Sequence, residues 1–282
     1  MGLRIANNVA ALNTHRWLSI ADANVTRSLE RLSSGYRVNK AADDAAGLAI
    51  SSRFRAQIRS LQQAQRNTSQ AVSMLQVAEG SLNEIHNILE RLKELATEAA
   101  SDTVGDTDRS KIDSEADTLL AEIDRISQAT KYSDTQLIYS TATTWGDTAY
   151  SADIQVGYKD EDYDKISISL KAINTATLGV NNFDLSSQAS AQAALNTLET
   201  AIASVAAARS DIGAVQNRLE YTAANLAVTV ENYVASDSVI RDVDMAAEMT
   251  NFTKNQILVQ SATAMLAHAN MLPQNVLTLI GR

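Results

Sequence analysis

Apolar residues near the carboxyl end of the chain recur at alternating intervals of four and three. They are Leu258, Ala262, Met265, Ala269, Leu272, Val276 and Leu279. This heptad spacing keeps one apolar stripe on a single side of a helix and favours packing against a partner helix. Pro273 falls within the stripe, which continues beyond it, so the pattern predicts a kinked helix rather than a helix end.

The amino-terminal end carries a weaker form of the same pattern. Its apolar residues form two groups, Ile5, Val9 and Leu12, and then Val25, Leu29, Leu32 and Tyr36. A single helix with such a stripe gains too little from burial to offset the entropy lost on ordering its backbone. We therefore expect both ends to bury their stripes against each other and against other copies of the chain. The predicted polymerisation seam consists of Ile5, Val9, Leu12, Leu29, Leu32, Leu258, Met265, Leu272, Val276 and Leu279.

Between the two ends, the pattern predicts further amphipathic helices over residues 43–100, 107–129 and 190–235. It is clearest from Leu75 to Ala96, where apolar residues again alternate at intervals of three and four. At about 1.5 Å per residue, the first of these helices would span roughly 80 Å. Such a long helix needs neighbouring helices along its length to cover its apolar side, so an elongated bundle is expected.

Residues 130–182 change from a helical period to a period of two. Ile154 and Val156 alternate with polar neighbours, and so do the apolar residues between Lys165 and Leu170. This alternation is typical of strands, which the acidic turn over residues 157–164 would join. The predicted fold is mainly α: a long antiparallel helical bundle or coiled coil, with a small β-hairpin region inserted between the amino- and carboxy-terminal helices.

These patterns divide the chain into three segments. Residues 1–42 and 238–282 are expected to form the two parts of a terminal coiled coil, and residues 43–237 the bundle with its β-rich insertion. The run from Ser33 to Gly35 should end the first helix, and Asp43 or Asp44 should cap the next.

Composition narrows the possible functions. Aromatic residues make up 5% of the chain and proline occurs once, which favours long helices. The formal charge of -9 is spread along the chain without a cluster of Lys and Arg, so no nucleic-acid partner is expected. No apolar run suits a membrane span or a cleavable secretory signal. A membrane partner is therefore not expected, and any export would use another route.

Catalytic and ligand-binding motifs are missing from the sequence. It contains no Gly-x-Ser-x-Gly elbow, phosphate-binding loop or dinucleotide-binding motif, and no cysteine. His15, His86 and His268 fall on separate predicted helices, with no second histidine at helical spacing. We predict no enzymatic activity, no cofactor and no metal site.

Blocks of sequence near the two ends are long and distinctive. They cover residues 4–13 (RIANNVAALN), 32–50 (LSSGYRVNKAADDAAGLAI) and 269–279 (ANMLPQNVLTL). On these blocks the chain resembles bacterial flagellin, the subunit of the flagellar filament. With the helices between them, the resemblance covers roughly residues 2–125 and 195–282.

The resemblance implies a self-assembling structural subunit of an extracellular propeller for swimming. The terminal segments would form the inner coiled-coil tube around a central channel, and residues 43–237 the outer tube. Only about residues 130–194 lie between the outer-tube helices, which implies a short form with little or no variable outer domain.

The resemblance also implies partners and an export route. Flagellins travel unfolded through a dedicated type III apparatus on an uncleaved amino-terminal signal. A cytosolic export chaperone would hold the segment around residues 252–279, and the assembled chain would meet a filament cap protein and the hook–filament junction protein.

In some flagellins a Toll-like receptor of innate immunity reads an Arg and a Leu on the long helix and a Glu on the next. The matching positions are Arg91, Leu95 and Glu115, while Glu90 stands where the activating pattern commonly has Gln. The alternative is that Arg91 and Glu115 are solvated helix charges and that Leu95 belongs to the apolar stripe.

Other functions remain open on the sequence. The hook–filament junction protein shares the terminal helices of flagellin. An amphipathic membrane-surface protein would also have long Ala-rich helices, although the acidic balance and the scarcity of Trp and Phe disfavour it. An enzyme within the β-rich insertion would need a paired nucleophile and base, which the sequence does not offer.

Overall fold

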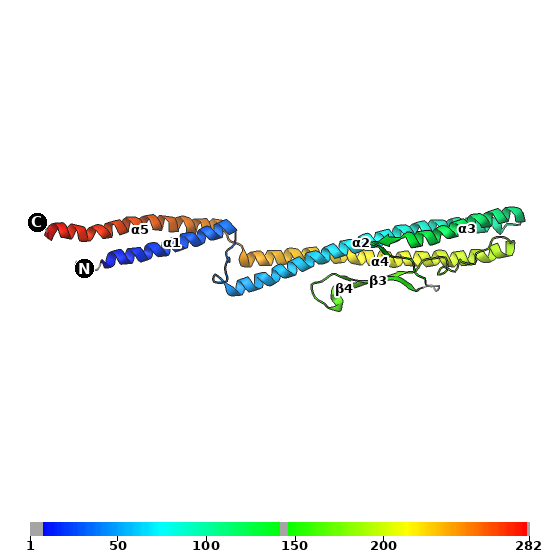
Figure 1. Cartoon of the computed structure of the whole chain (residues 1–282), viewed down its shortest axis with the longest axis horizontal. Coiled ribbons are helices and arrows are strands. Elements are labelled where there is room, and N and C mark those ends of the chain that lie inside the picture. The colour runs from blue at the N-terminus through cyan, green and yellow to red at the C-terminus, as the bar shows by residue number, and fades with distance from the viewer. Residues whose placement is uncertain (1–7, 142–145, 281–282) are drawn as a thin grey trace. The chain divides into compact units, whose positions relative to one another are not determined.

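The computed structural model describes residues 8–141 and 146–280, with side chains described up to Met271. The chain is mainly helical, as predicted (Figure 1). Its helices are α1 (Val9–Ser34), α2 (Ala45–Ala99), α3 (Asp106–Ala129), α4 (Gln188–Arg241) and α5 (Met245–Ile280). Its strands are β1 (Lys131–Tyr132), β2 (Thr135–Gln136), β3 (Thr148–Gln155) and β4 (Lys165–Lys171), with a short 3-10 turn at Asp162–Asp164. Helix α5 continues through Pro273.

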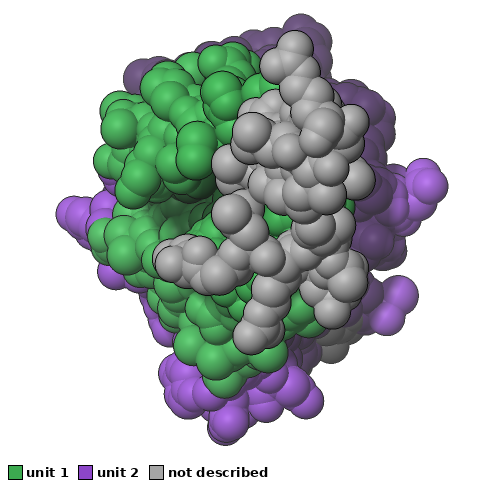
Figure 2. Space-filling model, turned by 90° about the vertical axis from the view of Figure 1, so that its left-hand side faces the viewer, with its two compact units in different colours: residues 1–56, 232–282 green, residues 57–231 purple. Residues whose placement is uncertain are grey.

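Contacts divide the chain into two compact units, which are coloured separately in Figure 2. Unit 1 comprises residues 1–56 and 232–282, and unit 2 comprises residues 57–231. The first division, after residue 56, falls inside α2, whereas the sequence patterns placed it after residue 42. The second falls inside α4 after residue 231, and the sequence patterns placed it after residue 237. One reason is that the rings of Phe54 and Tyr233, 5.6 Å apart, tie the start of α2 to the end of α4 within unit 1.

Unit 2 is built around one hydrophobic core shared by α2, α3, α4 and the β-rich region. Its fully buried side chains include Leu75, Leu82, Ile85, Leu89, Leu92, Leu95, Ile123, Leu137, Ile138, Ile168, Ile173 and Leu185. The helices run antiparallel. The Gln216 side chain of α4 donates to Glu79 of α2 at 3.0 Å, and Gln188 donates to the Ala100 carbonyl oxygen at 3.2 Å. The apolar residues at 3,4 spacing on α2, from Leu75 to Ala96, are all buried, so this spacing predicted the core-facing side of α2 correctly.

A buried arginine holds the turn between α2 and α3. The Arg109 guanidinium donates to the carbonyl oxygens of Ala99 and Ser101, both at 2.9 Å, and pairs with Asp106 at 2.8 Å. The last carbonyl groups of a helix have no partners within that helix. Arg109 supplies partners to the end of α2 and so fixes where the chain reverses.

The β-rich region contains the predicted hairpin. Strands β3 and β4 pair antiparallel, with Ile154 opposite Ile166, and the alternating apolar residues of β4 are buried in the core of unit 2. The sequence did not predict the β1–β2 hairpin, because strands of two residues have no measurable period. Its turn at Ser133 and Asp134 has positive φ at both residues, the geometry that matches the twist of paired strands.

The helix caps predicted for the connection from α1 to α2 are present in the structure. Gly35 has φ 73° and its amide donates to the Arg31 carbonyl oxygen at 2.8 Å, which ends α1. The Asp44 carboxylate accepts from the Gly47 amide at 2.8 Å and caps α2. Asp43 closes the turn before it, where the amide of Lys40 is the main group that lowers the pKa of its carboxyl.

Candidate assembly surface on the terminal helices

Helices α1 and α5 lie side by side in unit 1 (Figure 1). The Asn8 side chain donates to the Ala269 carbonyl oxygen at 2.7 Å. Farther along α1, the Ser28 hydroxyl donates to the Glu248 carboxylate at 2.5 Å. Partners late in α5 thus meet residues early in α1, so the pair is antiparallel.

The contact between the two helices uses small and polar residues as well as apolar ones. On α1 the less exposed positions follow the heptad spacing Ala11, Thr14, Leu18, Ala21, Val25, Ser28 and Leu32. On α5 they are Glu248, Phe252, Asn255, Val259, Ala262, Leu266 and Ala269. The facing residues thus range from Ala21 and Ser28 to Leu18 and Phe252, while several large apolar residues of both helices lie outside the contact.

Most described members of the predicted polymerisation seam lie on those outer sides. Val9, Leu12, Leu29, Leu258 and Met265 are 46–68% exposed. Leu32 is partly buried at the α1–α5 contact. Ile5 lies outside the described residues, as do the side chains of Leu272, Val276 and Leu279. Leu258 and Met265 each precede a residue that faces α1. The apolar stripe of α5 therefore extends beyond the side of the helix that contacts α1.

A groove of about 410 Å³ follows one side of the α1–α5 pair. Trp17 and Ile20 of α1 border it with Leu258 and Met265 of α5, and all four are exposed. Trp17 and Ile20 were not predicted from the sequence, because neither lies on the 4,3 series of the amino-terminal stripe. Both are large apolar side chains between the two groups of that stripe, and this was the signal that the sequence offered for them.

A polar cluster lies within the helix contact. Glu248 and Ser28 are both buried, and Arg31 lies 3.7 Å from the Glu248 carboxylate. Buried polar groups inside a coiled coil disfavour pairings in which they lose their partners, and so help to fix the register. The sequence carries a signal for this cluster, because Ser28 and Glu248 occupy positions in the two facing heptad series.

Replacing Glu248 with alanine is expected to loosen α1 and α5 without affecting unit 2. The change leaves the buried Ser28 hydroxyl and the Arg31 guanidinium without their shared partner, at a cost of about 1–3 kcal/mol. Amide hydrogen exchange measured in polymerised material should accelerate in α1 and α5 alone. Glu248→Gln keeps an acceptor for Ser28 and should have the smaller effect. Equal exchange in both variants would contradict this role of Glu248.

The receptor positions considered from the sequence fall in unit 2, and the structure separates them into two kinds. Arg91 of α2 and Glu115 of α3 form an exposed ion pair at 3.0 Å, and Arg91 also pairs with Glu94 at 2.9 Å. Hydrogen bonds to Glu94 and Glu115 raise the pKa of Arg91. Leu95 is only 2% exposed and belongs to the core.

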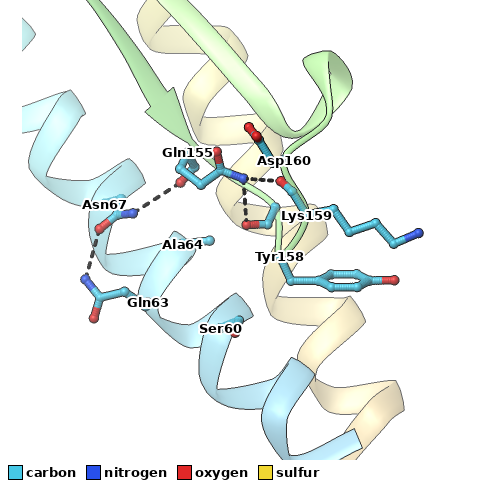
Figure 3. Close-up of a pocket in the computed structure, with 9 residues that line it drawn as sticks. Ser60, Gln63, Ala64, Asn67, Gln155, Tyr158, Lys159 and Asp160 are labelled. Atoms are coloured by element: carbon cyan, nitrogen blue, oxygen red, sulfur yellow. Dashed lines mark hydrogen bonds between the residues drawn. The ribbon is translucent and has the colours of Figure 1, made fainter. Parts of the chain in front are cut away.

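A second surface hollow, of about 360 Å³, lies where the turn after β3 meets α2 (Figure 3). Asn67 of α2 donates to the Gln155 carbonyl oxygen at 3.2 Å, and the Gln155 side chain donates to the Lys159 carbonyl oxygen at 2.6 Å. The first bond holds the turn against α2 and the second closes the turn itself, so these polar groups serve the fold of unit 2.

Neither a metal centre nor a membrane span is found within the part of the chain that the structure describes. No group of His, Cys, Asp or Glu residues there is suited to holding a metal ion. Likewise, no helix among the described residues is both long and apolar enough to cross a bilayer.

Comparisons with known proteins identify the family of the chain. Residues 5–143 match the bacterial flagellin N-terminal helical region, and residues 195–280 match the bacterial flagellin C-terminal helical region. A flagellin from Halalkalibacterium halodurans is 41% identical over 98% of this chain and 99% of its own length. The flagellar filament 33 kDa core protein of Treponema phagedenis is 38% identical over 98% of this chain and 99% of its own length.

A solved structure described as a flagellar hook-associated protein from Vibrio parahaemolyticus shares the fold. It has a TM-score of 0.59 and covers 71% of this chain and 99% of its own, at 15% sequence identity. The two matching helical regions and the relatives of nearly equal length decide the family. The chain belongs to the bacterial flagellin family.

Proposed function

We propose that copies of the chain polymerise by burying the outer apolar side chains of α1 and α5 against neighbouring copies. As a flagellin, the chain is a structural subunit of the extracellular flagellar filament. The observation that supports this route of assembly is the exposure of Val9, Leu12, Leu29, Leu258 and Met265. Fully burying a side chain of this size contributes about 1.5–3 kcal/mol, so several such contacts per subunit would drive assembly.

The distribution of exposed apolar residues supports the same surface. Most of the large apolar side chains that are exposed in the described chain belong to unit 1, although unit 2 is the longer unit. Unit 2 buries its long apolar series in its own core. The fold of unit 2 therefore needs no second copy, whereas α1 and α5 leave apolar surface for one.

The three other functions considered from the sequence are not favoured. The relatives that match nearly the whole chain are named as flagellins and filament core proteins, and the likeness to the hook-associated structure is one of fold. Neither of these relatives is named as a membrane-surface protein. The function is structural rather than catalytic.

Electron microscopy of the purified chain tests this proposal. The intact chain, given short filament seeds or ammonium sulfate, should form long tubes with a central channel. A version trimmed to residues 43–237 retains the core of unit 2 and should remain folded, as circular dichroism would show, but should not polymerise. Tubes from the trimmed version would contradict a role for the terminal helices, and the absence of tubes from the intact chain would contradict polymerisation itself.

Several partners are proposed on the family relationship. An export chaperone would cover the segment around residues 252–279 before secretion, where Ile257, Leu258 and Met265 expose apolar surface that favours unspecific association. A cap protein would meet subunits at the filament tip, and the hook–filament junction protein would meet the first of them.

Recognition by a Toll-like flagellin receptor is a further proposal for unit 2. The exposed ion pair of Arg91 and Glu115 offers charges of both signs from two neighbouring helices. Leu95 would contribute by packing beneath them, since its side chain is buried.

A further inference from the structure

Helix α5 carries most of the sulfur in this chain. The sequence has six methionines and no cysteine, and Met245, Met249, Met265 and Met271 all lie on α5. Each of these four is 46–59% exposed, whereas Met74 in the core of unit 2 is 4% exposed. Without a thiol to compete, thioethers are the sulfur groups at which a peroxide can react.

Two of these residues border hollows on the terminal helices. Met265 lies at the groove beside Trp17 and Leu258. Met249 borders a hollow of about 530 Å³ with Ile257 and Leu258. A change in the polarity of either sulfur therefore acts directly on the apolar surface that α5 presents.

We propose that the exposed methionines of α5 are a hydroperoxide-sensitive modification site that controls whether a free subunit can join a filament. In the reaction, a lone pair on the thioether sulfur attacks one oxygen of hydrogen peroxide. The O–O bond breaks and an S=O bond forms, while the proton on the attacked oxygen transfers to the departing oxygen, which leaves as water. The sulfur is oxidised by two electrons to the sulfoxide and the peroxide is reduced.

The proposal rests on the proposed function, because it concerns the same surface. A sulfoxide is polar and accepts hydrogen bonds, and burying it against apolar side chains without a donor is unfavourable. The free subunit exposes its α5 sulfurs to the oxidant, while a subunit already in the filament shields those at the contacts. Oxidation would thus stop new subunits from adding and leave existing filaments intact.

Seeded elongation of the full chain tests this inference. Purified subunits are treated with hydrogen peroxide, quenched, and mapped by peptide mass spectrometry before they are added to seeds. We expect sulfoxide at the α5 methionines but not at Met74, and elongation slowed by about tenfold or more relative to the untreated chain. Methionine sulfoxide reductases of both stereospecificities should restore elongation.

Matched variants separate the α5 sulfurs from other effects of peroxide, each compared with its own untreated sample. The combined variant Met245→Leu, Met249→Leu, Met265→Leu and Met271→Leu should lose its sensitivity to peroxide. Met74→Leu should remain as sensitive as the native chain. Treated native chain that elongates normally although its α5 methionines are oxidised would overturn the inference, as would full sensitivity in the combined variant. Native chain that fails to elongate before treatment would overturn the proposed function as well.

Discussion

Subunits in which Leu258 and Met265 are both replaced by aspartate are expected to stay folded and to form no filaments. In the free chain both side chains are about half exposed and lie outside the α1–α5 contact, so the two carboxylates remain hydrated and that contact is unaffected. In a filament built through this surface the same carboxylates would be buried against apolar neighbours without partners. Removing an unpaired charge from water costs several kcal/mol per ion, which exceeds what the apolar contact provides.

Seeded elongation followed by light scattering and electron microscopy measures this loss, and circular dichroism checks the fold. Gln260→Asp is the control for an added carboxylate on α5, because Gln260 is an exposed polar residue of the same helix. We expect the control to elongate and the double variant to show no growth. Filaments of ordinary length from the double variant would mean that α5 does not meet its neighbours through Leu258 and Met265.

Leu95→Ala is expected to lower the free energy of unfolding of unit 2 by about 2–5 kcal/mol. Leu95 is nearly inaccessible and packs in the core, so truncation leaves a cavity. Arg91→Ala and Glu115→Ala each break an exposed ion pair and should change stability by about 1 kcal/mol or less. Urea unfolding followed by circular dichroism measures these differences.

The same variants distinguish contact from packing in receptor recognition. If the receptor reads Arg91 and Glu115, their substitution should reduce signalling while the unfolding midpoint stays near that of the native chain. Loss of signalling in Leu95→Ala should accompany the loss of stability and should be relieved at lower temperature. A stable Leu95→Ala variant with no signalling would show that Leu95 itself is contacted.

Much of the fold follows from periodicity alone. The series from Leu75 to Ala96 predicted a long helix with one buried side, and all of the large apolar members of that series are in the core. The alternation around Ile166 predicted a strand with one buried face. Gly35 and Asp44 marked helix ends through their backbone and capping preferences. These features were predictable because each depends on neighbouring residues.

The candidate assembly surface was less predictable, because spacing does not say which of two adjacent series faces the partner helix. Leu258 and Val259 are neighbours on α5, yet the larger Leu258 lies outside the contact and Val259 within it. The choice depends on α1, whose side facing α5 contains the buried residues Ala21 and Ser28. The Ser28–Glu248 bond depends in turn on the register of two distant segments.

A reconstruction of the assembled filament by electron cryo-microscopy, at a resolution that shows side chains, tests the central claim most directly. The account predicts that Leu258 and Met265, which are exposed in the single chain, are buried against α1 or α5 of neighbouring copies. It also predicts that the bond between Ser28 and Glu248 persists within each subunit. Filaments in which Leu258 and Met265 stay exposed to water, with unit 2 alone making the contacts between subunits, would contradict it.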